Sequence, residues 1–342
     1  MKFFYIDKDI HKAETLHSDY YKNQDVFNNS IKKIFFSSWQ LIGHTKQFNK
    51  DVNPMIFMPK LISEPLVLTK EKEKIYCLSN VCTHRAHMVC NDAYNSKSLR
   101  CPYHGRTFSL NGSLKNASGF NDAKNFPSSK DNLKNFKVKN WMDFIFISLG
   151  QSVDIDSVLN DIKLRVGTFP FDKLSFSNSL SNEFEIDVHW AIYCENYLEG
   201  FHVPFVHKGL SKEINNMTYE TIPLKNGCVQ FAKNHNSDEI YGYYYWIFPN
   251  IMMNFYDWGL SVNIIEPISK NKTRVRFLSY PILDNKKVKK EVTDLVTVEM
   301  EDQMVIRSVQ KGIESNFYKR GRYSPKHEKG VHHFHRILSK YI

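Results

Sequence analysis

Short segments that are apolar, or that alternate between apolar and polar residues, recur along the chain and predict β-strands. They lie at 65–69, 74–81 and 98–101 in the first half, and at 184–190, 228–234, 242–248, 260–267 and 273–281 in the second. Gly, Asn and Pro residues separate them, and the pair Asn111-Gly112 is typical of a hairpin turn. The order of these segments fits antiparallel sheets.

Helices are predicted in several places, one of which ends near His202. Residues up to about 33 form an arm with helical character, a second helix lies around 157–166, and a long amphipathic helix begins near Val292. In that last helix the apolar residues recur with helical spacing at Leu295, Val296, Ile306, Val309 and Ile313. The predicted fold class is therefore α+β, with a small all-β domain and a second domain in which helices pack on an antiparallel sheet.

Two half-motifs in the predicted all-β part carry the first candidate site. They are Cys82-Thr-His84 and, further along, Cys101-Pro-Tyr-His104. A Rieske [2Fe–2S] cluster takes two cysteine thiolates on one iron and two histidine imidazoles on the other. The same four residues can also hold a structural zinc ion. Zinc-finger spacing groups the cysteines together and the histidines together, whereas here each half-motif has one of each, so the order of ligands favours the Rieske cluster.

A second candidate site follows the strand predicted at 184–190. His202 and His207 lie at the end of a predicted helix and in its following turn, where both can reach one metal ion. A carboxylate would complete the two-histidine, one-carboxylate set that leaves positions open on non-haem Fe(II). Either histidine alone would be more simply explained by packing or ordinary polar contacts.

The carboxylate has to come from far along the chain. Asp302 falls on or near the apolar stripe of the last helix, where an unpaired carboxylate is costly unless it binds a metal. Glu299 lies near the same stripe and Glu301 adjoins it. Periodicity therefore leaves three candidates for the third ligand.

The sequence around these motifs resembles that of a known protein family. VCTHRAHMVC and LRCPYHGRTFSLNGSL are similar to the Rieske domain of ring-hydroxylating and choline-monooxygenase-like oxygenases, and ENYLEGFHVPFVH is similar to their catalytic domain. Ala86 departs from the pattern, because the family commonly has glycine there; we expect a slightly altered loop with the cluster retained. The segment EMEDQMVIRSVQKGIES resembles the family's late helix, and this resemblance nominates Asp302 as the third ligand.

The resemblance also gives Glu199 a role. In the family, the carboxylate at this position connects an iron histidine of one subunit to a Rieske histidine of its neighbour. We therefore expect Glu199 to hydrogen-bond His202 and, across an interface, His104. Cluster and iron lie too far apart within one subunit of the family for efficient electron transfer, so this role implies an oligomer, and a homotrimer is expected.

The function implied is that of the terminal oxygenase component of a Rieske non-haem iron system. Such a chain receives electrons from a separate NAD(P)H-dependent reductase or ferredoxin, activates O₂ at Fe(II) and oxygenates a small organic substrate, here a quaternary ammonium compound or an aromatic ring. The predicted domains are an N-terminal arm at 1–32, a Rieske domain at 33–150 and a catalytic domain at 151–342. The alternative is a Rieske electron-transfer protein without oxygenase activity.

Composition narrows the remaining possibilities. The chain has 342 residues, a net charge of +10 and six cysteines. Its lysines are dispersed and no nucleic-acid motif accompanies them, so the charge favours docking of an acidic electron donor. The N-terminus lacks the apolar region of a signal peptide and no apolar run approaches membrane-spanning length, which predicts a cytoplasmic protein.

The segment 241–267 is the most aromatic of the chain and resembles the strands that line the pocket of choline- and carnitine-type monooxygenases. Aromatic walls suit either a flat ring or a quaternary ammonium held by cation–π attraction. The residues of interest are Tyr193, Tyr197, Trp246, Tyr256 and Trp258.

Overall fold

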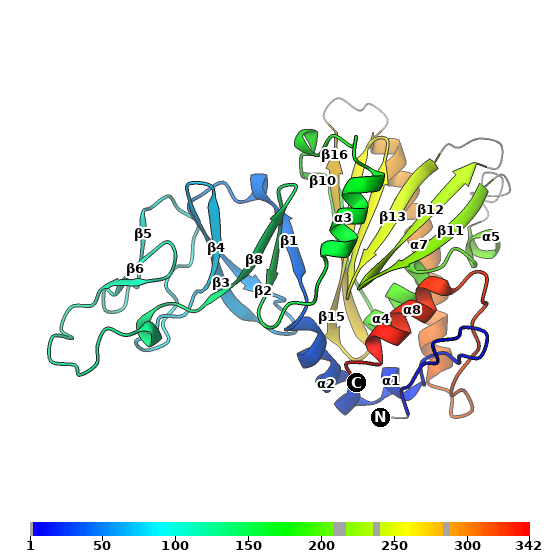
Figure 1. The fold of residues 1–342 in the computed structure, drawn as a ribbon, viewed down its shortest axis with the longest axis horizontal. Coiled ribbons are helices and arrows are strands. Elements are labelled where there is room, and N and C mark those ends of the chain that lie inside the picture. Colours follow the sequence, from blue (N-terminus) through cyan, green and yellow to red (C-terminus); the bar gives the residue numbers. More distant parts are fainter. Residues whose placement is uncertain (1–2, 208–216, 235–239, 283–287) are drawn as a thin grey trace. The chain divides into compact units, whose positions relative to one another are not determined.

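The computed structural model describes residues 3–207, 217–234, 240–282 and 288–342. In the described part, the chain forms two compact units (Figure 1). The outer unit comprises Met1–Ser38 and Val153–Ile342, and the inserted unit comprises Trp39–Ser152. The predicted arm ended at residue 32, whereas α2 (Gln24–Phe35) continues to Phe35 because its last turn buries Ile34 and Phe35.

The inserted unit, whose residues are all described, contains only β-sheets and two short 3₁₀ turns. A six-stranded sheet has the order β1-β9-β8-β4-β3-β2 and a three-stranded sheet the order β5-β6-β7. The strands are β1 (Gln40–His44), β2 (Val52–Phe57), β3 (Glu64–Glu71), β4 (Lys74–Ser79), β5 (Ser98–Arg100), β6 (Thr107–Ser109), β7 (Leu114–Asn116), β8 (Asn135–Trp141) and β9 (Phe144–Ser148). The small-β prediction is confirmed.

The core of the inserted unit reaches the first candidate site. Val67, Leu78 and Phe108 are fully buried in one hydrophobic cluster that also includes the thiol residues Cys82 and Cys101. The predicted hairpin turn lies between β6 and β7, where Gly112 has φ +90°. A side chain there would also come within 3.2 Å of the carbonyl oxygen of Leu133, so glycine satisfies both the backbone and the packing.

The outer unit is built on a sheet that has seven strands among the described residues, in the order β10-β16-β15-β14-β13-β12-β11. The strands are β10 (Ser177–Ile186), β11 (Met217–Leu224), β12 (Gly227–Asn234), β13 (Ile240–Ile247), β14 (Ile251–Tyr256), β15 (Gly259–Ser269) and β16 (Lys272–Pro281). Every neighbouring pair is antiparallel. The predicted antiparallel sheet is confirmed.

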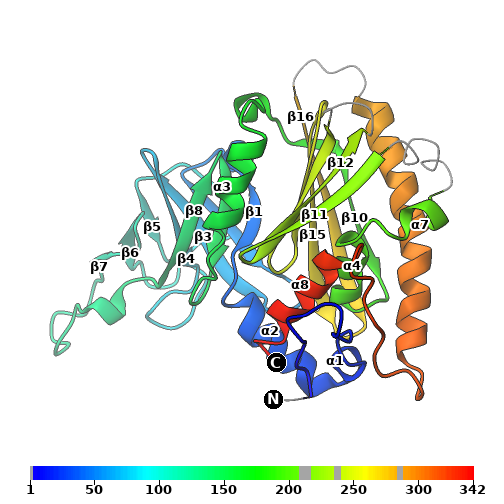
Figure 2. The same ribbon diagram turned by 45° about the vertical axis from the view of Figure 1, so that its right-hand side comes forward.

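Helices cover both faces of this sheet. The helices among the described residues of this unit are α1 (Asp19–Lys22), α2, α3 (Asp156–Arg165), α4 (Trp190–Tyr197), α5 (Val203–Val206), α7 (Val288–Ile313) and α8 (Lys329–Leu338). Tyr245 of β13 donates a hydrogen bond to Asp161 of α3, whereas Asn254, the partner of Tyr244, accepts one from Tyr197 of α4. Because successive side chains of a strand point to opposite faces, α3 and α4 lie on opposite sides. Figure 2 shows α7 running along the outer unit beside this sheet.

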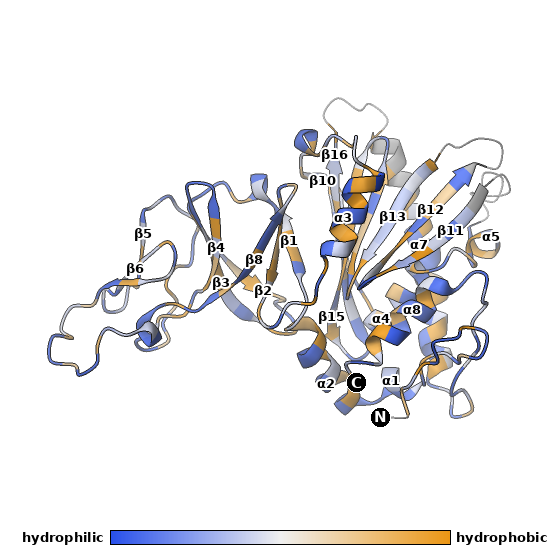
Figure 3. Ribbon diagram, in the orientation of Figure 1, coloured by the Kyte–Doolittle hydropathy of each residue, from blue (hydrophilic) through white to orange (hydrophobic). Residues whose placement is uncertain are grey.

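Two elements differ from the prediction. The strand predicted over 184–190 ends at Ile186, and Trp190 instead begins α4. His189 ends the extended segment because its Nδ1 accepts the backbone N–H of Ala191, which caps the helix. Helix α8 was not predicted; it buries Phe334, Ile337 and Leu338, and Figure 3 shows both hydrophobic and hydrophilic colours along it.

The N-terminal arm is joined to the last part of the chain. The backbone N–H groups of Thr15 and Ser18 donate to the carbonyl groups of Gly321 and Lys319. The N–H of Leu16 donates to Nδ1 of the buried His335 on α8. The arm is thus an integral part of the outer unit. Among the described residues, no helix is both long enough and apolar enough to cross a membrane.

Candidate metal centres

The two loops that carry the cysteine–histidine half-motifs share one backbone pattern. In each, the cysteine N–H donates to the carbonyl five residues on, and the N–H four residues on donates to the cysteine carbonyl. The bonds are Cys82 to His87 at 2.8 Å, Ala86 to Cys82 at 3.0 Å, Cys101 to Arg106 at 2.8 Å and Gly105 to Cys101 at 3.0 Å. Each half-motif therefore closes into a tight loop that presents its cysteine and histidine together.

The four predicted ligands are brought together by these loops. The imidazole rings of His84 and His104 are 4.6 Å apart, and the thiols of Cys82 and Cys101 are both buried. Burial raises the pKa of the Cys82 thiol, and the neighbouring Cys101 raises it further. In the described chain the Nδ1 atom of His84 is buried without a hydrogen-bond partner. A buried imidazole nitrogen left free in this way fits a metal ligand.

Ala86 occupies the position where glycine was expected, and the structure shows what that costs. Ala86 has φ +56° and Gly105, its counterpart in the second loop, has φ +70°. A left-handed conformation is unfavourable by about 1–2 kcal/mol for a residue with a Cβ atom. The loop keeps the shared backbone pattern, so alanine strains this loop without changing its hydrogen bonds.

We expect Ala86→Gly to stabilise the inserted unit slightly. Relief of the left-handed strain outweighs the extra flexibility of glycine in the unfolded chain by less than about 1 kcal/mol. The measurement is the denaturant concentration at which the visible absorbance of the cluster is lost, compared between wild type and variant. A lower midpoint for Ala86→Gly would contradict this reading of the loop.

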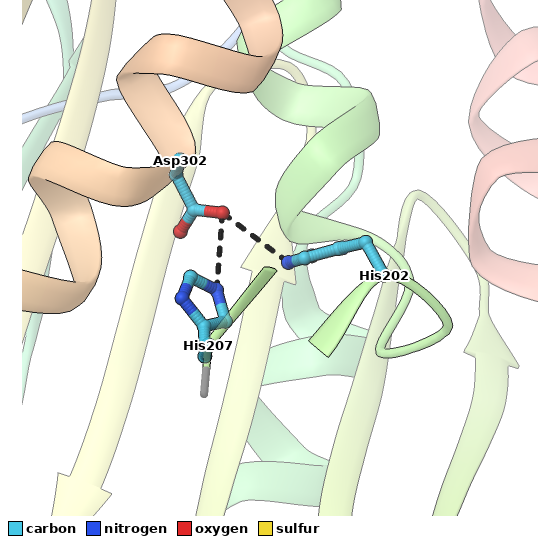
Figure 4. A group of neighbouring side chains, drawn as sticks. All are labelled: His202, His207 and Asp302. Carbon is cyan, nitrogen blue, oxygen red and sulfur yellow. Dashed lines mark ion pairs between the residues drawn. The ribbon is translucent and has the colours of Figure 1, made fainter. Parts of the chain in front are cut away.

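The second candidate centre brings together residues from both ends of one helix and from a second helix (Figure 4). His202 precedes the short helix α5, His207 follows it, and Asp302 extends from α7. Oδ1 of Asp302 lies 3.2 Å from Nε2 of each histidine. Ligands about 2.1 Å from a divalent metal ion lie about 3 Å from one another when their bonds are perpendicular. Both histidine–aspartate distances fit this value, and all three ligand atoms lie within 4.8 Å of one another, so the three side chains could hold a single ion.

Each of these histidines has a carboxylate on its other nitrogen. Nδ1 of His202 donates to Glu199 at 2.5 Å, as predicted, and Nδ1 of His207 donates to Glu301 at 2.7 Å. With Glu199 and Glu301 on the Nδ1 side of the rings, the Nε2 atoms of both histidines face Asp302. Partners of this kind fix the ring orientation and raise the basicity of a metal ligand.

The electrostatics of this centre favour a bound cation. Burial lowers the pKa of His202, but hydrogen bonds to Asp302 and Glu199 outweigh it and raise the pKa to about 9. Burial raises the pKa of Asp302, but its bonds to both histidines leave the pKa below its usual range. The carboxylates thus hold positive charge on the rings, which a divalent ion bound between the side chains would replace.

The two other acidic residues near Asp302 have separate partners. Glu301 contacts His207 as described, and Glu299 accepts a hydrogen bond of 2.6 Å from Tyr193. Burial raises the pKa of Glu299 to about 8. Asn196 of α4, which was not predicted, donates to Asp302 at 3.3 Å. Of the three carboxylates left open by periodicity, only Asp302 lies between the histidines.

The predicted pocket aromatics separate into different environments. Trp246 is fully buried and packs against Phe334, so it belongs to the core. Tyr197, by contrast, lies on the α4 side of the sheet, as does Tyr244, which faces Tyr256 at 5.8 Å. The ring of Tyr256 stacks on Trp258 at 5.4 Å. Three tyrosines and a tryptophan thus group near the face that carries α4.

Comparisons with known proteins agree with both centres. Residues 38–127 match the family model of the Rieske [2Fe-2S] domain, and residues 216–342 match that of the ring hydroxylating alpha subunit (catalytic domain). Choline monooxygenase, chloroplastic, from Arabidopsis thaliana is 28% identical over 96% of this chain and 83% of its own length. The Atriplex hortensis choline monooxygenase is 30% identical over 94% of this chain and 77% of its own length.

The chain belongs to the Rieske non-haem iron oxygenase alpha-subunit family. A solved structure of the quaternary ammonium Rieske monooxygenase CntA with L-carnitine has the same fold, with a TM-score of 0.79 and 22% identity over 96% of each chain. As a member of this family, the 342-residue chain is an oxidoreductase, and its cofactors are a [2Fe–2S] cluster and a mononuclear iron. The zinc alternative is therefore wrong, and the presence of the catalytic domain rules out the alternative of an electron-transfer protein without oxygenase activity.

Oxygenases of this family require a reductase or ferredoxin as well as substrate and O₂, so the predicted need for an electron donor holds at that level. The identity of the electron donor stays a prediction. So does the cytoplasmic location, since the plant relatives are named as chloroplastic.

Proposed function

We propose that this chain is the oxygenase component of a monooxygenase that acts on a quaternary ammonium compound. Cys82, His84, Cys101 and His104 hold the cluster, and His202, His207 and Asp302 hold the iron. The observation that carries the proposal is the placement of Asp302 at 3.2 Å from both histidines, in a chain that also has the Rieske loops. The choline monooxygenases among its relatives support the choice of substrate.

In this proposal each residue has a defined task. When bound, the cluster supplies single electrons, and the iron supplies open positions at which O₂ is activated. Glu199 keeps the Nδ1 proton on His202 and Glu301 keeps that on His207, so both rings stay fixed with Nε2 toward the metal. Asn196 holds Asp302 in place through its side-chain amide. Overall, one atom of O₂ enters a C–H bond and the other leaves as water, with two electrons and two protons consumed.

We also infer that the chain works as a homotrimer with a separate NAD(P)H-dependent reductase or ferredoxin. Glu199 is only partly buried within one chain, with 14% of its side chain exposed, although it already binds His202. Its Oε1 accepts from His202 Nδ1 and its Oε2 from the backbone N–H groups of Phe201 and His202, so a bond to His104 of a neighbouring subunit would use the remaining acceptor capacity of the exposed side. The net charge of +10 suits an acidic electron donor.

The substrate class follows from the aromatic group. Tyr197, Tyr244, Tyr256 and Trp258 group near one face of the sheet, and rings of this kind can bind a cation that cannot donate hydrogen bonds, with cation–π contacts contributing about 2 kcal/mol when desolvated. An aromatic ring as substrate is the second candidate, because the same faces could stack on it. Oxygen uptake with the chain, a reductase and NADH should be stimulated by choline or betaine-like compounds and not by naphthalene.

We expect Tyr244→Leu to raise KM for the quaternary ammonium substrate roughly 10- to 30-fold, from the loss of about 2 kcal/mol of cation–π attraction. Tyr243→Leu is the matched control, because it is the adjacent residue on β13 and points to the opposite face. Steady-state oxygen uptake gives KM for both variants. Equal effects of the two substitutions would point to a loss of packing and against the proposed binding surface.

A further inference from the structure

Arg106 places a positive charge inside the inserted unit beside both cluster loops. It follows His104 by two residues, yet only 3% of it is exposed. Its Nη1 donates to the hydroxyl of Thr83 at 3.2 Å. Thr83 stands between Cys82 and His84, so one guanidinium group links the first loop to the second. An arginine side chain remains charged throughout the pH range in which proteins are folded.

Two phenylalanine rings help to keep water away from this charge. The guanidinium carbon lies 4.5 Å from the ring centre of Phe120 and 5.1 Å from that of Phe126. The two rings stack on each other at 4.7 Å, and Phe120 also contacts the ring of His84 edge-on at 5.2 Å. A cation on the aromatic faces is stabilised there, and the same wall borders a cluster histidine.

The carboxylate of Asp131 is the negative charge nearest to Arg106, and it affects the cluster less than Arg106 does. Oδ1 of Asp131 lies 3.6 Å from Nη1, and the other oxygen of Asp131 accepts two bonds from Ser128. The Asp131 side chain is 19% exposed against 4% for Arg106, so solvent screens the carboxylate more. The guanidinium group of Arg106 bonds the Thr83 hydroxyl directly, whereas Asp131 meets the same hydroxyl only through its uncharged backbone carbonyl, at 2.7 Å. The cluster loops therefore experience a net positive field.

We propose that Arg106 is a positioning residue that raises the reduction potential of the Rieske cluster. Reduction adds one electron to the cluster and makes it more negative, so a buried cation nearby stabilises the reduced state. Net charge and solvent exposure are among the factors that set these potentials. The inference rests on the cluster ligands of the proposed function and assigns to Arg106 the task of holding the electron on the cluster until it is passed on.

The test is a redox titration of the purified chain, followed by circular dichroism and electron-spin resonance of the cluster. We expect Arg106→Met to lower the equilibrium constant for reduction about tenfold, equivalent to about 59 mV for a one-electron couple. Asp131→Asn should shift the potential in the opposite direction, because it removes the opposing charge. A purely structural role would not produce shifts of opposite sign.

Arg85→Met is the matched control, since it removes the same charge from the residue next to His84. Arg85 is exposed, so solvent screens it and the shift should be less than threefold. Arg106→Lys, which keeps the charge, should retain a potential near wild type even if Arg106→Met folds poorly. An unchanged potential in both Arg106→Met and Asp131→Asn, with the Rieske signal intact, would overturn the inference about Arg106 and leave the proposed cluster site standing. A wild-type chain without a Rieske signal would overturn the proposed cluster site itself.

Discussion

Replacing Asp302 with alanine is expected to remove the mononuclear iron and abolish turnover while the cluster spectrum stays unchanged. Oδ1 of Asp302 is the group shared by His202 and His207, each at 3.2 Å, and the two histidines alone leave a metal ion with too few ligands. The cluster residues belong to the inserted unit and are untouched by the change. Iron per chain should therefore fall by one while cluster iron and its visible absorbance remain.

Two neighbouring carboxylates provide graded controls for this result. Glu301→Ala removes the partner of His207 Nδ1 and should weaken iron binding roughly 10- to 100-fold without abolishing it. Glu299→Ala removes only the partner of the Tyr193 hydroxyl and should retain the iron. If Glu299→Ala or Glu301→Ala loses the iron completely and Asp302→Ala keeps it, the assignment of Asp302 is wrong.

Glu199→Gln is expected to leave both metal centres assembled but to slow electron transfer between them. The substitution keeps the size of the side chain and removes its charge, so the bond to His202 loses its charge-assisted character. Hydrogen bonds to charged groups contribute about 1.5–3 kcal/mol, so we expect a slowing of roughly 10- to 100-fold. The measurement is single turnover: the cluster is reduced, substrate and O₂ are added, and cluster reoxidation is followed.

Glu301→Gln is the matched control for this experiment. It removes the same charge from the carboxylate that binds Nδ1 of His207, the other iron histidine. Glu301, however, has no expected contact with a neighbouring cluster. It should alter iron affinity more than it alters reoxidation. Reoxidation of Glu199→Gln at the wild-type rate, with full metal content, would contradict the relay and remove the main support for the trimer.

The cluster loops could be predicted from sequence because their chemistry is local. Each half-motif places a cysteine and a histidine within one tight turn, so spacing alone specifies which side chains meet. The sequence likewise indicated that Ala86 departs from the family pattern within this loop. The structure adds that its backbone is left-handed, with φ +56°. Both strands of the hairpin at Asn111-Gly112 followed from the turn residues for the same reason.

The iron centre could be predicted only in part. Asp302, Glu299 and Glu301 lie within one turn of α7, and apolar periodicity assigns a face with no better precision than one residue. Their contacts with His202, Tyr193 and His207 depend on how α7 packs against α4 and α5, which no local pattern encodes. Asn196 gave no signal, because an amide in a helix is ordinarily solvated or packed.

Helix α8 was missed although a signal was present. Val331, Phe334, Ile337 and Leu338 recur with helical spacing and are all buried. Three histidines among them made the segment look polar, but His332 and His335 are buried as well and have partners in the N-terminal arm and in Tyr323. Burial of hydrogen-bonded histidines cannot be inferred from hydropathy.

The bond between Leu16 and His335 sets an order of events during synthesis. These residues are 319 positions apart, so the outer unit cannot close until nearly the whole chain has left the ribosome. Within the described chain, the sheets of residues 39–152 contain no strand from elsewhere, and domains generally fold as units during synthesis. The sheets that carry the proposed cluster ligands can therefore form while Asp302, the last proposed ligand of the single iron along the chain, is still being translated.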